Sequence, residues 1–238
     1  MVEKLYVTYN DNTPCSPNPP HPMAPSTKHN LLTPLNQVHK LCQESATEIL
    51  EKFQPQLMIA IGGGGFIPAR ILRSFLKQPG SPNIPIQAIG LSLYETLPET
   101  LGGVATPDGA PEVPGTKVTR TQWLDLSALG EMENLIGKRI LIVDEVDDTR
   151  TTLEYAVKEL EKDVEAARQR MGGKGEKTQF GIFVLHNKDK KKKGVLPEDM
   201  MASGQYFVAR TVKDIWINYP WEAIDIDEHD RLGAGQPK

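Results

Sequence analysis

The sequence has few cysteines and lacks long apolar runs. Cys15 and Cys42 are its only cysteines, too few for a disulfide framework and without the paired spacing of a metal site. No apolar run approaches the ~20 residues that cross a bilayer. Residues 1–10 contain Glu3 and Lys4 and no apolar core typical of a secretory signal. These absences predict a reduced, cytoplasmic protein that does not bind a membrane.

The chain also lacks a strong excess of charge. Its net charge is −4, with 39% apolar and 24% charged residues. This is an ordinary globular composition, which argues against a disordered, collagen-like or coiled-coil chain. Mild acidity gives no reason to expect a nucleic-acid partner. With 238 residues, the chain is expected to form one large domain, or one domain with additions.

Proline and glycine are unevenly distributed. Seven prolines lie between Pro14 and Pro34, where large apolar side chains are almost absent. Because such a segment cannot bury apolar surface, we interpret residues 1–33 as a solvated extension and residues 34–238 as the folded domain. Four prolines and four glycines lie between Pro98 and Gly115. Long internal loops of this kind are usually functional lids or disordered inserts.

Helical and strand patterns alternate along the rest of the chain. Helical spacing predicts helices over Pro34–Phe53, after Pro68, and over Leu153–Val164. Apolar runs predict strands over the ranges Leu57–Ile61, Ile84–Leu93, Ile140–Val143 and Phe180–Leu185. Continuous apolar strands separated by helices indicate a parallel sheet covered on both faces. The predicted fold class is therefore α/β.

One acidic segment follows a predicted strand. The sequence DEVDDTRTT, residues 144–152, lies between the apolar run ILIV and the next helix. Its crowded carboxylates repel one another unless a cation or hydrogen-bond donors compensate. Carboxylate oxygens suit Mg²⁺, whereas hydroxyls and free N–H groups at a helix N-terminus suit phosphate. A sugar phosphate with Mg²⁺ would match both ends of this turn.

Less specific interpretations exist for each of these features. ILIVDE also fits a Walker B strand, but the chain has no G-x-x-x-x-G-K-[ST] cradle. The run Gly62–Gly65 alone is more often a strand-to-helix turn than a ligand site. The basic run Lys190–Lys193 is typical of a solvated loop or targeting patch. Trp216 and Trp221 could be core aromatics, and we expect His186 and Cys42 to be structural.

The segment ILIVDEVDDTRTT resembles the phosphoribosyl pyrophosphate motif of type I phosphoribosyltransferases. The segments IAIGGGGFIPARILRSFL, IPIQAIGLSLYE, VTRTQWLD, IFVLHNKDK and DIWINYPWE follow in the order of the fungal xanthine and hypoxanthine-guanine members. The resemblance extends roughly over residues 35–227. It implies a Rossmann-like parallel sheet flanked by helices, with a small C-terminal hood at about 186–230 and a flexible lid at about 93–120.

The resemblance assigns roles to the acidic segment. Asp144 and Glu145 would hold the ribose hydroxyls directly or through Mg²⁺, and Asp148 would be the catalytic base or acid facing purine N7. The 5′-phosphate would be bound by Asp148, Thr149, Arg150, Thr151 and Thr152.

The other ligand groups fall on other segments. Lys188 would donate to the purine 6-oxo group, Trp216 would stack on the base, and Ile217 would read the edge of the base through backbone groups. Glu222 would be a metal-linked acid beside the purine. Pyrophosphate would be bound by Gly62, Gly63, Gly64, Gly65 and Tyr94.

Three positions depart from the family pattern. Leu93 stands where the family usually has serine, so a serine contact to pyrophosphate is absent there. Arg150 replaces a common glycine; if the position needs a positive φ, Arg carries a steric penalty, although its guanidinium could add phosphate affinity. Asp147 replaces an apolar residue, and we expect it to point to solvent.

The resemblance implies a purine-salvage enzyme. It would convert a 6-oxopurine and phosphoribosyl pyrophosphate into a nucleoside 5′-monophosphate, with Mg²⁺ as cofactor. Xanthine is the first choice of base, with XMP as product; hypoxanthine and guanine, giving IMP and GMP, are the alternative. A second alternative is a regulatory protein that binds the sugar phosphate without catalysis. A homodimer or higher homo-oligomer is expected.

Overall fold

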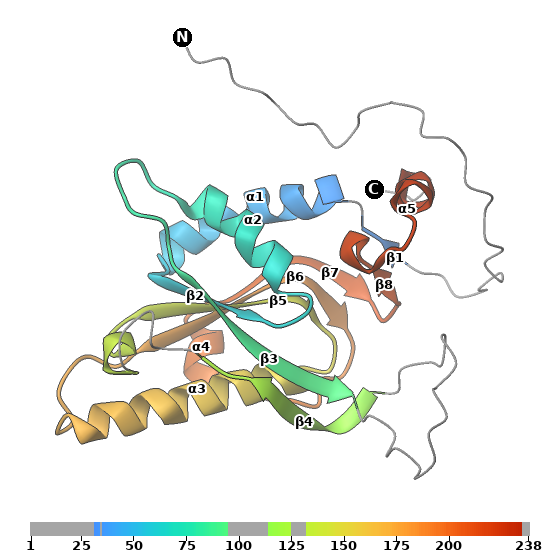
Figure 1. Ribbon diagram of the computed structural model, residues 1–238. Helices are drawn as coiled ribbons and strands as arrows, with labels where there is room; N and C mark the ends of the chain where they lie inside the picture. Colours follow the sequence, from blue (N-terminus) through green and yellow to red (C-terminus); the bar gives the residue numbers. More distant parts are fainter. Residues whose placement is uncertain (1–30, 34, 95–113, 125–131, 235–238) are drawn as a thin grey trace.

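The computed structural model describes residues 31–33, 35–94, 114–124 and 132–234, which contain a six-stranded sheet (Figure 1). The strand order is β4-β3-β2-β5-β6-β7, with all neighbours parallel except the antiparallel pair β3–β4. The predicted α/β class with a mostly parallel sheet is confirmed. The strands are β2 (Leu57–Ile61), β3 (Ile86–Tyr94), β4 (Pro114–Gln122), β5 (Arg139–Asp147), β6 (Gln179–Asp189) and β7 (Tyr206–Lys213).

Helices cover both faces of this sheet. α1 (Leu35–Lys52) and α2 (Phe66–Leu76) lie on one face, and α3 (Thr151–Arg170) lies on the other with the short α4 (Glu198–Ala202) (Figure 1). A 3₁₀ turn, η1 (Met132–Leu135), precedes β5. No helix within the described ranges has the length and apolar character that a membrane crossing requires.

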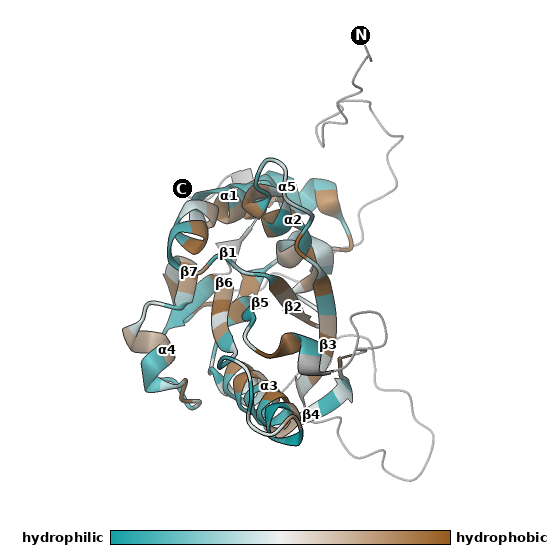
Figure 2. Cartoon of the chain, turned by 90° about the vertical axis from the view of Figure 1, so that its left-hand side faces the viewer, coloured by the Kyte–Doolittle hydropathy of each residue, from teal (hydrophilic) through white to brown (hydrophobic). Residues whose placement is uncertain are grey.

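The central strands bury side chains on both sides. In β2 every residue is buried, and successive residues face opposite layers, as the pleat of a strand requires. Met58 and Ala60 pack toward α1 and α2, whereas Leu57, Ile59 and Ile61 pack toward the α3 side. Figure 2 shows these hydrophobic strands enclosed between the helical layers. Double-sided burial explains why the strands appear in the sequence as continuous apolar runs.

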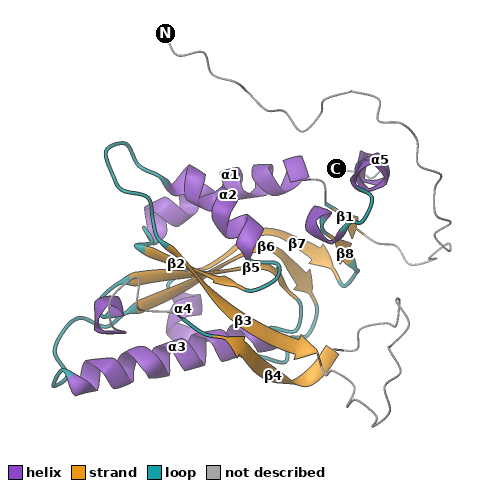
Figure 3. Ribbon diagram, viewed as in Figure 1, coloured by secondary structure: helices purple, strands orange, loops and turns teal. Residues whose placement is uncertain are grey.

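A small hood lies at the carboxyl end of the sheet. It consists of β1 (Leu31–Leu32), β8 (Ile217–Asn218), the 3₁₀ turn η2 (Pro220–Glu222) and α5 (Ile226–Ala234), with β1 and β8 paired in parallel (Figure 3). β1 lies on the N-terminal side of the predicted domain boundary at residue 33. Residues 31 and 32 therefore join the hood through strand pairing, although they follow a proline-rich stretch.

The predicted helices and strands agree with the observed ones, apart from some boundaries. β5 and β6 extend four residues past the apolar runs, to Asp147 and Asp189. The lid predicted over residues 93–120 overlaps two strands, because β3 ends at Tyr94 and β4 begins at Pro114. The sequence did not predict β4 or β7; Pro114 is tolerated because β4 is an edge strand. Residues 95–113 lie outside the described ranges.

The strand order indicates where a ligand site is expected. From β2 the chain moves outward to β3 and β4, whereas β5, β6 and β7 are added on the other side of β2. In open α/β sheets, ligands bind beyond the carboxyl ends of the strands where the order reverses in this way. Here that point lies between β2 and β5, so the turns after these two strands form the expected site.

Candidate active site

The acids at the end of β5 lie in the strand itself. The sequence predicted that Asp144 and Glu145 would begin a turn, but β5 pairs with β6 up to Asp147. The Asp144 side chain is buried, and its Oδ1 accepts a hydrogen bond of 3.0 Å from the Glu145 N–H. Burial, followed by the charge of Glu145, raises the pKa of Asp144 well above its usual value. Two adjacent carboxylates are thus held where water does not fully stabilise their charge.

The glycine turn after β2 contacts the second of these acids. A Cβ at Gly64 would lie 1.4 Å from Oε2 of Glu145, so any larger residue there would require the Glu145 carboxylate to move. Gly63 has φ +88°, a conformation that side chains rarely adopt. The turn is fixed by hydrogen bonds from Gly62 N to Ile89 O and from Gly65 N to Ile61 O. The predicted pyrophosphate and ribose segments are therefore in direct contact.

Asp148 lies between two lysine ammonium groups. Its Oδ1 is 2.6 Å from the Lys190 Nζ and 3.5 Å from the Lys188 Nζ. Partial burial alone would raise the pKa of Asp148, but the hydrogen bond from Lys190 and the two positive charges lower it. Asp148 is therefore a carboxylate at neutral pH, partly open to solvent.

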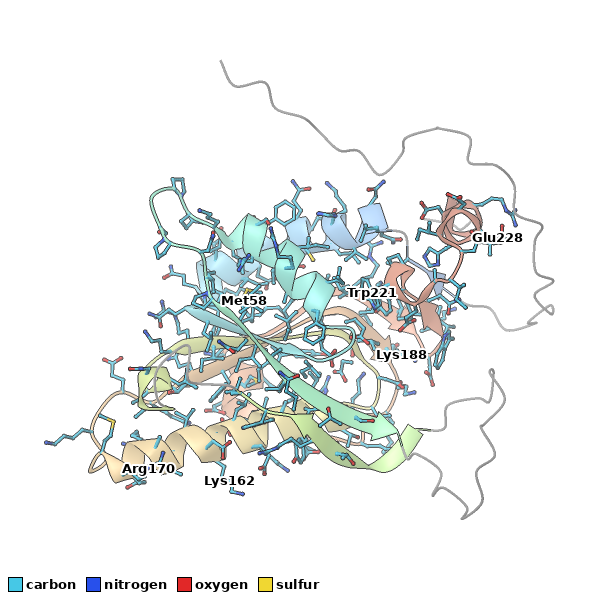
Figure 4. The ribbon with its side chains drawn as sticks, viewed as in Figure 1. Met58, Lys162, Arg170, Lys188, Trp221 and Glu228 are labelled. Carbon is cyan, nitrogen blue, oxygen red and sulfur yellow. The ribbon has the colours of Figure 1, made fainter. Side chains whose placement is uncertain are left out.

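Lys188 connects this carboxylate with the hood. It lies near the end of β6 with a buried side chain, and its Nζ is 5.9 Å from the ring centre of Trp216. Trp216 is 54% exposed, so it is not a core aromatic. Ile217, the next residue, is buried in β8. Figure 4 shows Lys188 at the carboxyl edge of the sheet beside the hood, far from Arg170 at the end of α3.

The start of α3 offers free backbone donors. α3 begins at Thr151, and its first intrahelical bond runs from Glu154 N to Arg150 O. The N–H groups of residues 151–153 consequently have no partner within the helix. The Thr149 and Thr151 hydroxyls lie 3.0 Å apart at the same place. Together with the positive end of the helix dipole, these groups suit a phosphate.

The positive φ considered for Arg150 is present, whereas Asp147 differs from expectation. Arg150 has φ +69°, a left-handed conformation that costs a non-glycine residue ~1–2 kcal/mol. The expectation that Asp147 points to solvent is wrong: its side chain is fully buried. It accepts hydrogen bonds from Arg150 Nε at 2.9 Å and from the Tyr206 hydroxyl at 2.5 Å. A strand that continues to Asp147 turns this side chain inward, toward β7.

A buried pair joins the hood to the sheet. The Tyr219 hydroxyl donates to the Glu145 carbonyl at 3.0 Å and lies 2.9 Å from Nδ1 of His186. Since this hydroxyl has one proton, His186 Nδ1 is the donor to it. Tyr219 also stacks on Trp221, with ring centres 4.7 Å apart. As expected, His186 is structural; so is Cys42, whose thiol contacts the Pro68 carbonyl.

The acids fit a cation held jointly with a substrate. Glu145 Oε2 is buried and has no hydrogen-bond partner among the described residues. Mg²⁺ is usually bound by one or two carboxylates together with substrate phosphates and water. No group of three or more His, Cys, Asp or Glu side chains in the described ranges could hold a metal by itself. Glu222 lies in the hood, where its carboxylate accepts a 3.5 Å bond from Tyr219 N.

Sequence reasoning missed several residues around the site. Lys190 and Lys192 were expected in a solvated loop, but Lys190 bridges Asp148 and Asp214, and Lys192 donates to three backbone carbonyls. The lysines at 188, 190 and 192 alternate along the chain, a spacing that could have indicated a shared face. Tyr206 and Tyr219 left no such signal, because their contacts are distant in sequence.

Two curated relatives match most of the chain. The chain is 58% identical over 195 residues to the hypoxanthine-guanine phosphoribosyltransferase of Schizosaccharomyces pombe, covering 82% of this chain and 90% of the relative. It is 55% identical over 203 residues to xanthine phosphoribosyltransferase 1 of Saccharomyces cerevisiae, covering 84% and 93%. No protein-family model matches.

Solved structures agree with this likeness. A hypothetical protein from Neisseria gonorrhoeae, determined with bound ppGpp, has a TM-score of 0.64 at 37% identity and covers 89% of this chain and 99% of its own. A purine phosphoribosyltransferase from Pyrococcus horikoshii shares the fold, with a TM-score of 0.51 at 24% identity and coverage of 81% and 93%. Given identities above one half over most of both chains, this protein belongs to the family of hypoxanthine-guanine and xanthine phosphoribosyltransferases, enzymes of purine salvage.

Proposed function

We propose that this protein transfers the phosphoribosyl group from phosphoribosyl pyrophosphate to a 6-oxopurine, with xanthine as its first substrate. The observation that carries this proposal is the pairing of Asp148 with Lys188, 3.5 Å apart, with the Lys188 Nζ 5.9 Å from the centre of the exposed Trp216 ring. A carboxylate that accepts a ring proton and an ammonium that donates to an oxo group match the N7 and 6-oxo edge of such a base. The Trp216 ring offers an apolar surface for stacking.

The sugar phosphate occupies the two turns at the switch point in this proposal. The free N–H groups at the start of α3 and the Thr149 and Thr151 hydroxyls hold the 5′-phosphate. Asp144 and Glu145 bind the ribose hydroxyls, and the glycine turn lets the diphosphate approach its backbone closely. Mg²⁺, bound through Asp144 and Glu145 with the substrate, would neutralise charge on the leaving diphosphate.

The reaction then consists of one substitution at C1 of the ribose and one proton transfer from the purine. A purine nitrogen bonds to C1 of the ribose while the bond from C1 to the diphosphate oxygen breaks and pyrophosphate leaves with its electron pair. Asp148 accepts the proton that departs from N7. Because Lys188 and Lys190 keep Asp148 ionised, the acceptor is ready at neutral pH. The residue types support transfer rather than binding alone, since a non-catalytic site has no use for a base there.

Steady-state rates with xanthine, hypoxanthine and guanine test the proposal. Relatives with either specificity match the chain comparably, and Asn218 and Tyr219 do not decide the base by residue type. We expect kcat/KM to be highest for xanthine; a negligible xanthine rate beside rapid guanine turnover would favour the alternative substrate. Thermal-shift titration with XMP, GMP and IMP is an independent check, since the preferred product stabilises the native state most. Absence of transfer to all three bases would refute the activity.

Two properties stay as predictions alongside this function. A cytoplasmic location is expected from the low cysteine content and the lack of long apolar runs in the sequence. A homodimer follows from the general preference for two-fold assemblies. Fractionation and light scattering measure them directly.

A further inference from the structure

The buried Asp147 side chain contacts two cationic side chains and one hydroxyl group. Its Oδ2 accepts hydrogen bonds from Arg150 Nε at 2.9 Å and Tyr206 Oη at 2.5 Å, and its Oδ1 is 3.4 Å from Lys192 Nζ. The side chain itself is completely buried. A buried carboxylate persists only when such partners compensate its lost hydration. The cluster therefore connects β5, the start of α3, β7 and the segment after β6.

Arg150 is the partner whose backbone is unusual. It occupies the N-cap position of α3 with φ +69°, which glycine adopts without strain and arginine does not. Its guanidinium carbon lies 4.9 Å from the ring centre of Tyr206. The guanidinium thus points toward Asp147 and β7, so that the side chain contributes an anchor within the protein.

The segment after β6 holds the same turn from a second side. Lys192 Nζ donates to the Asp147, Asp148 and Lys188 carbonyls at 2.7, 3.1 and 2.8 Å. The N–H groups of Lys193 and Gly194 donate to the Thr149 carbonyl at 2.9 and 3.1 Å. The backbone of residues 147–150 is therefore tied at several consecutive carbonyls.

We propose that Asp147 is a positioning residue: through Arg150, Tyr206 and Lys192 it fixes the left-handed conformation at residue 150 that presents the phosphate-binding turn. This inference rests on the proposed function and deepens it. The ion pair between Asp147 and Arg150 holds residue 150 at a positive φ, which a glycine would adopt there without strain. In this assignment Asp147 does not contact the substrate, and the Arg150 guanidinium binds Asp147 rather than the phosphate.

A double-mutant cycle over Asp147 and Arg150 tests the assignment. KM and calorimetric Kd for phosphoribosyl pyrophosphate, KM for the base, and kcat are measured for Asp147→Asn, Arg150→Gly, Arg150→Ala and Asp147→Asn/Arg150→Gly. When Arg150 is present, we expect Asp147→Asn to raise the KM and Kd for phosphoribosyl pyrophosphate about fivefold or more. When Asp147→Asn is added to the Arg150→Gly variant, we expect these constants to rise less than about twofold. We expect Arg150→Ala to bind about fivefold more weakly than Arg150→Gly, because alanine keeps the steric penalty without the anchor.

Two results would overturn the assignment. If Arg150→Gly and Arg150→Ala weaken binding equally, by about tenfold or more, the guanidinium itself meets the phosphate. If Asp147→Asn has the same effect in both backgrounds, or changes both substrates' KM values alike, its role is general stability. Should Asp147→Asn not fold, the comparison of glycine with alanine at position 150 still decides. Failure of the proposed function is recognised separately, since the unmodified protein would then transfer to no base.

Discussion

At the scale of single residues, the site depends on charges that the protein only partly neutralises. Asp148 has two lysine ammonium groups as neighbours, whereas Asp144 and Glu145 have each other and a glycine turn. The pKa of Asp148 is lowered and that of Asp144 is raised, each for the reasons given above. Neighbouring carboxylates in one motif thus differ in their affinity for a proton, because their surroundings differ.

The Asp148→Asn variant isolates proton transfer. The amide keeps the shape of the side chain but cannot accept a proton, so kcat should fall about 10²- to 10⁴-fold. The Kd for phosphoribosyl pyrophosphate, measured by calorimetry, should change little. Glu51→Gln, an exposed carboxylate on α1, is the control for charge removal. A kcat within about threefold of the unmodified enzyme would remove Asp148 from the mechanism.

Asp144→Asn/Glu145→Gln tests the cation and ribose contacts. Hydrogen bonds to charged groups contribute ~1.5–3 kcal/mol each, so affinity for phosphoribosyl pyrophosphate with Mg²⁺ should fall at least about tenfold. Calorimetry with and without Mg²⁺ should also show that the variant has lost most of the Mg²⁺ dependence. The melting temperature should not fall, because burial and the neighbouring Glu145 charge disfavour the charge of Asp144. Unchanged affinity would refute the assignment.

Gly64→Ala tests the contact between the two turns. The new methyl group would overlap the Glu145 carboxylate, so that side chain must move. Because the overlapping atoms are the end of a flexible side chain, we expect a small change in unfolding free energy and weaker phosphoribosyl pyrophosphate binding. Gly80→Ala is a control with open space around the new atom; its φ of +77° strains alanine, so it should lower stability without weakening binding of the donor. If both variants bind the donor equally well, the position of Glu145 does not matter for binding.

At the scale of elements, β5 and β6 supply the site because they extend beyond their apolar runs. Their parallel pairing continues through Asp147 and Asn187. This pairing places Asp144 and Glu145 of β5 and Lys188 of β6 at the same carboxyl edge of the sheet, where Asp147 and His186 are almost completely buried. The segment after β6 then turns back against the start of α3, where a Cβ at Gly194 would lie 2.4 Å from the Arg150 carbonyl oxygen.

Gly194→Ala should consequently displace the phosphate-binding turn. Because the atom in the way belongs to the backbone, we expect the KM for phosphoribosyl pyrophosphate to rise at least about fivefold and the unfolding free energy to fall by ~1–3 kcal/mol. Gly204→Ala has a positive φ of +67° with no atom within 4 Å of the new Cβ, so it should lower stability without changing that KM. Equal KM values in the two variants would contradict the prediction.

At the scale of the whole molecule, Tyr219 fixes the hood over the sheet. It contacts Glu145 of β5 and His186 of β6 while stacking on Trp221. His186 is buried, and burial, followed by the charge of Arg210, lowers its pKa to about 4. Its Nε2 has no hydrogen-bond partner among the described residues, so protonation would place an unsatisfied charge in the interior.

His186 should therefore make stability depend on pH. Between a pKa of about 4 in the folded protein and the usual ~6.5 in the unfolded chain, the unfolded state binds the extra proton, so stability falls as pH falls through this range. Linkage gives a loss of ~2 kcal/mol between about pH 7.5 and about pH 5. Denaturant titrations should show this extra loss in the unmodified protein relative to His186→Asn. The same pH dependence in both would contradict it.

Much of this protein was predictable because its signals are local. Apolar runs bounded by glycine gave β2 within one residue, and helical spacing gave α1, α2 and α3. β4 escaped prediction because Pro114 and Gly115 weaken a strand pattern that pairing with β3 nevertheless stabilises. The acidic motif identified the positions of Asp144, Glu145 and Asp148, since carboxylates at a strand end are a chemical signal in themselves.

The sequence by itself determined the α/β class and the position of an acidic segment at the end of a strand, because periodicity and residue type act over a few neighbouring positions. Only the tertiary structure decided the roles of Asp147, Arg150, Lys192 and Tyr206. Asp147 and Tyr206 are 59 residues apart in the chain but share a hydrogen bond. Whether a charged side chain is solvated or buried depends on what the fold brings against it, and no local pattern contains that information.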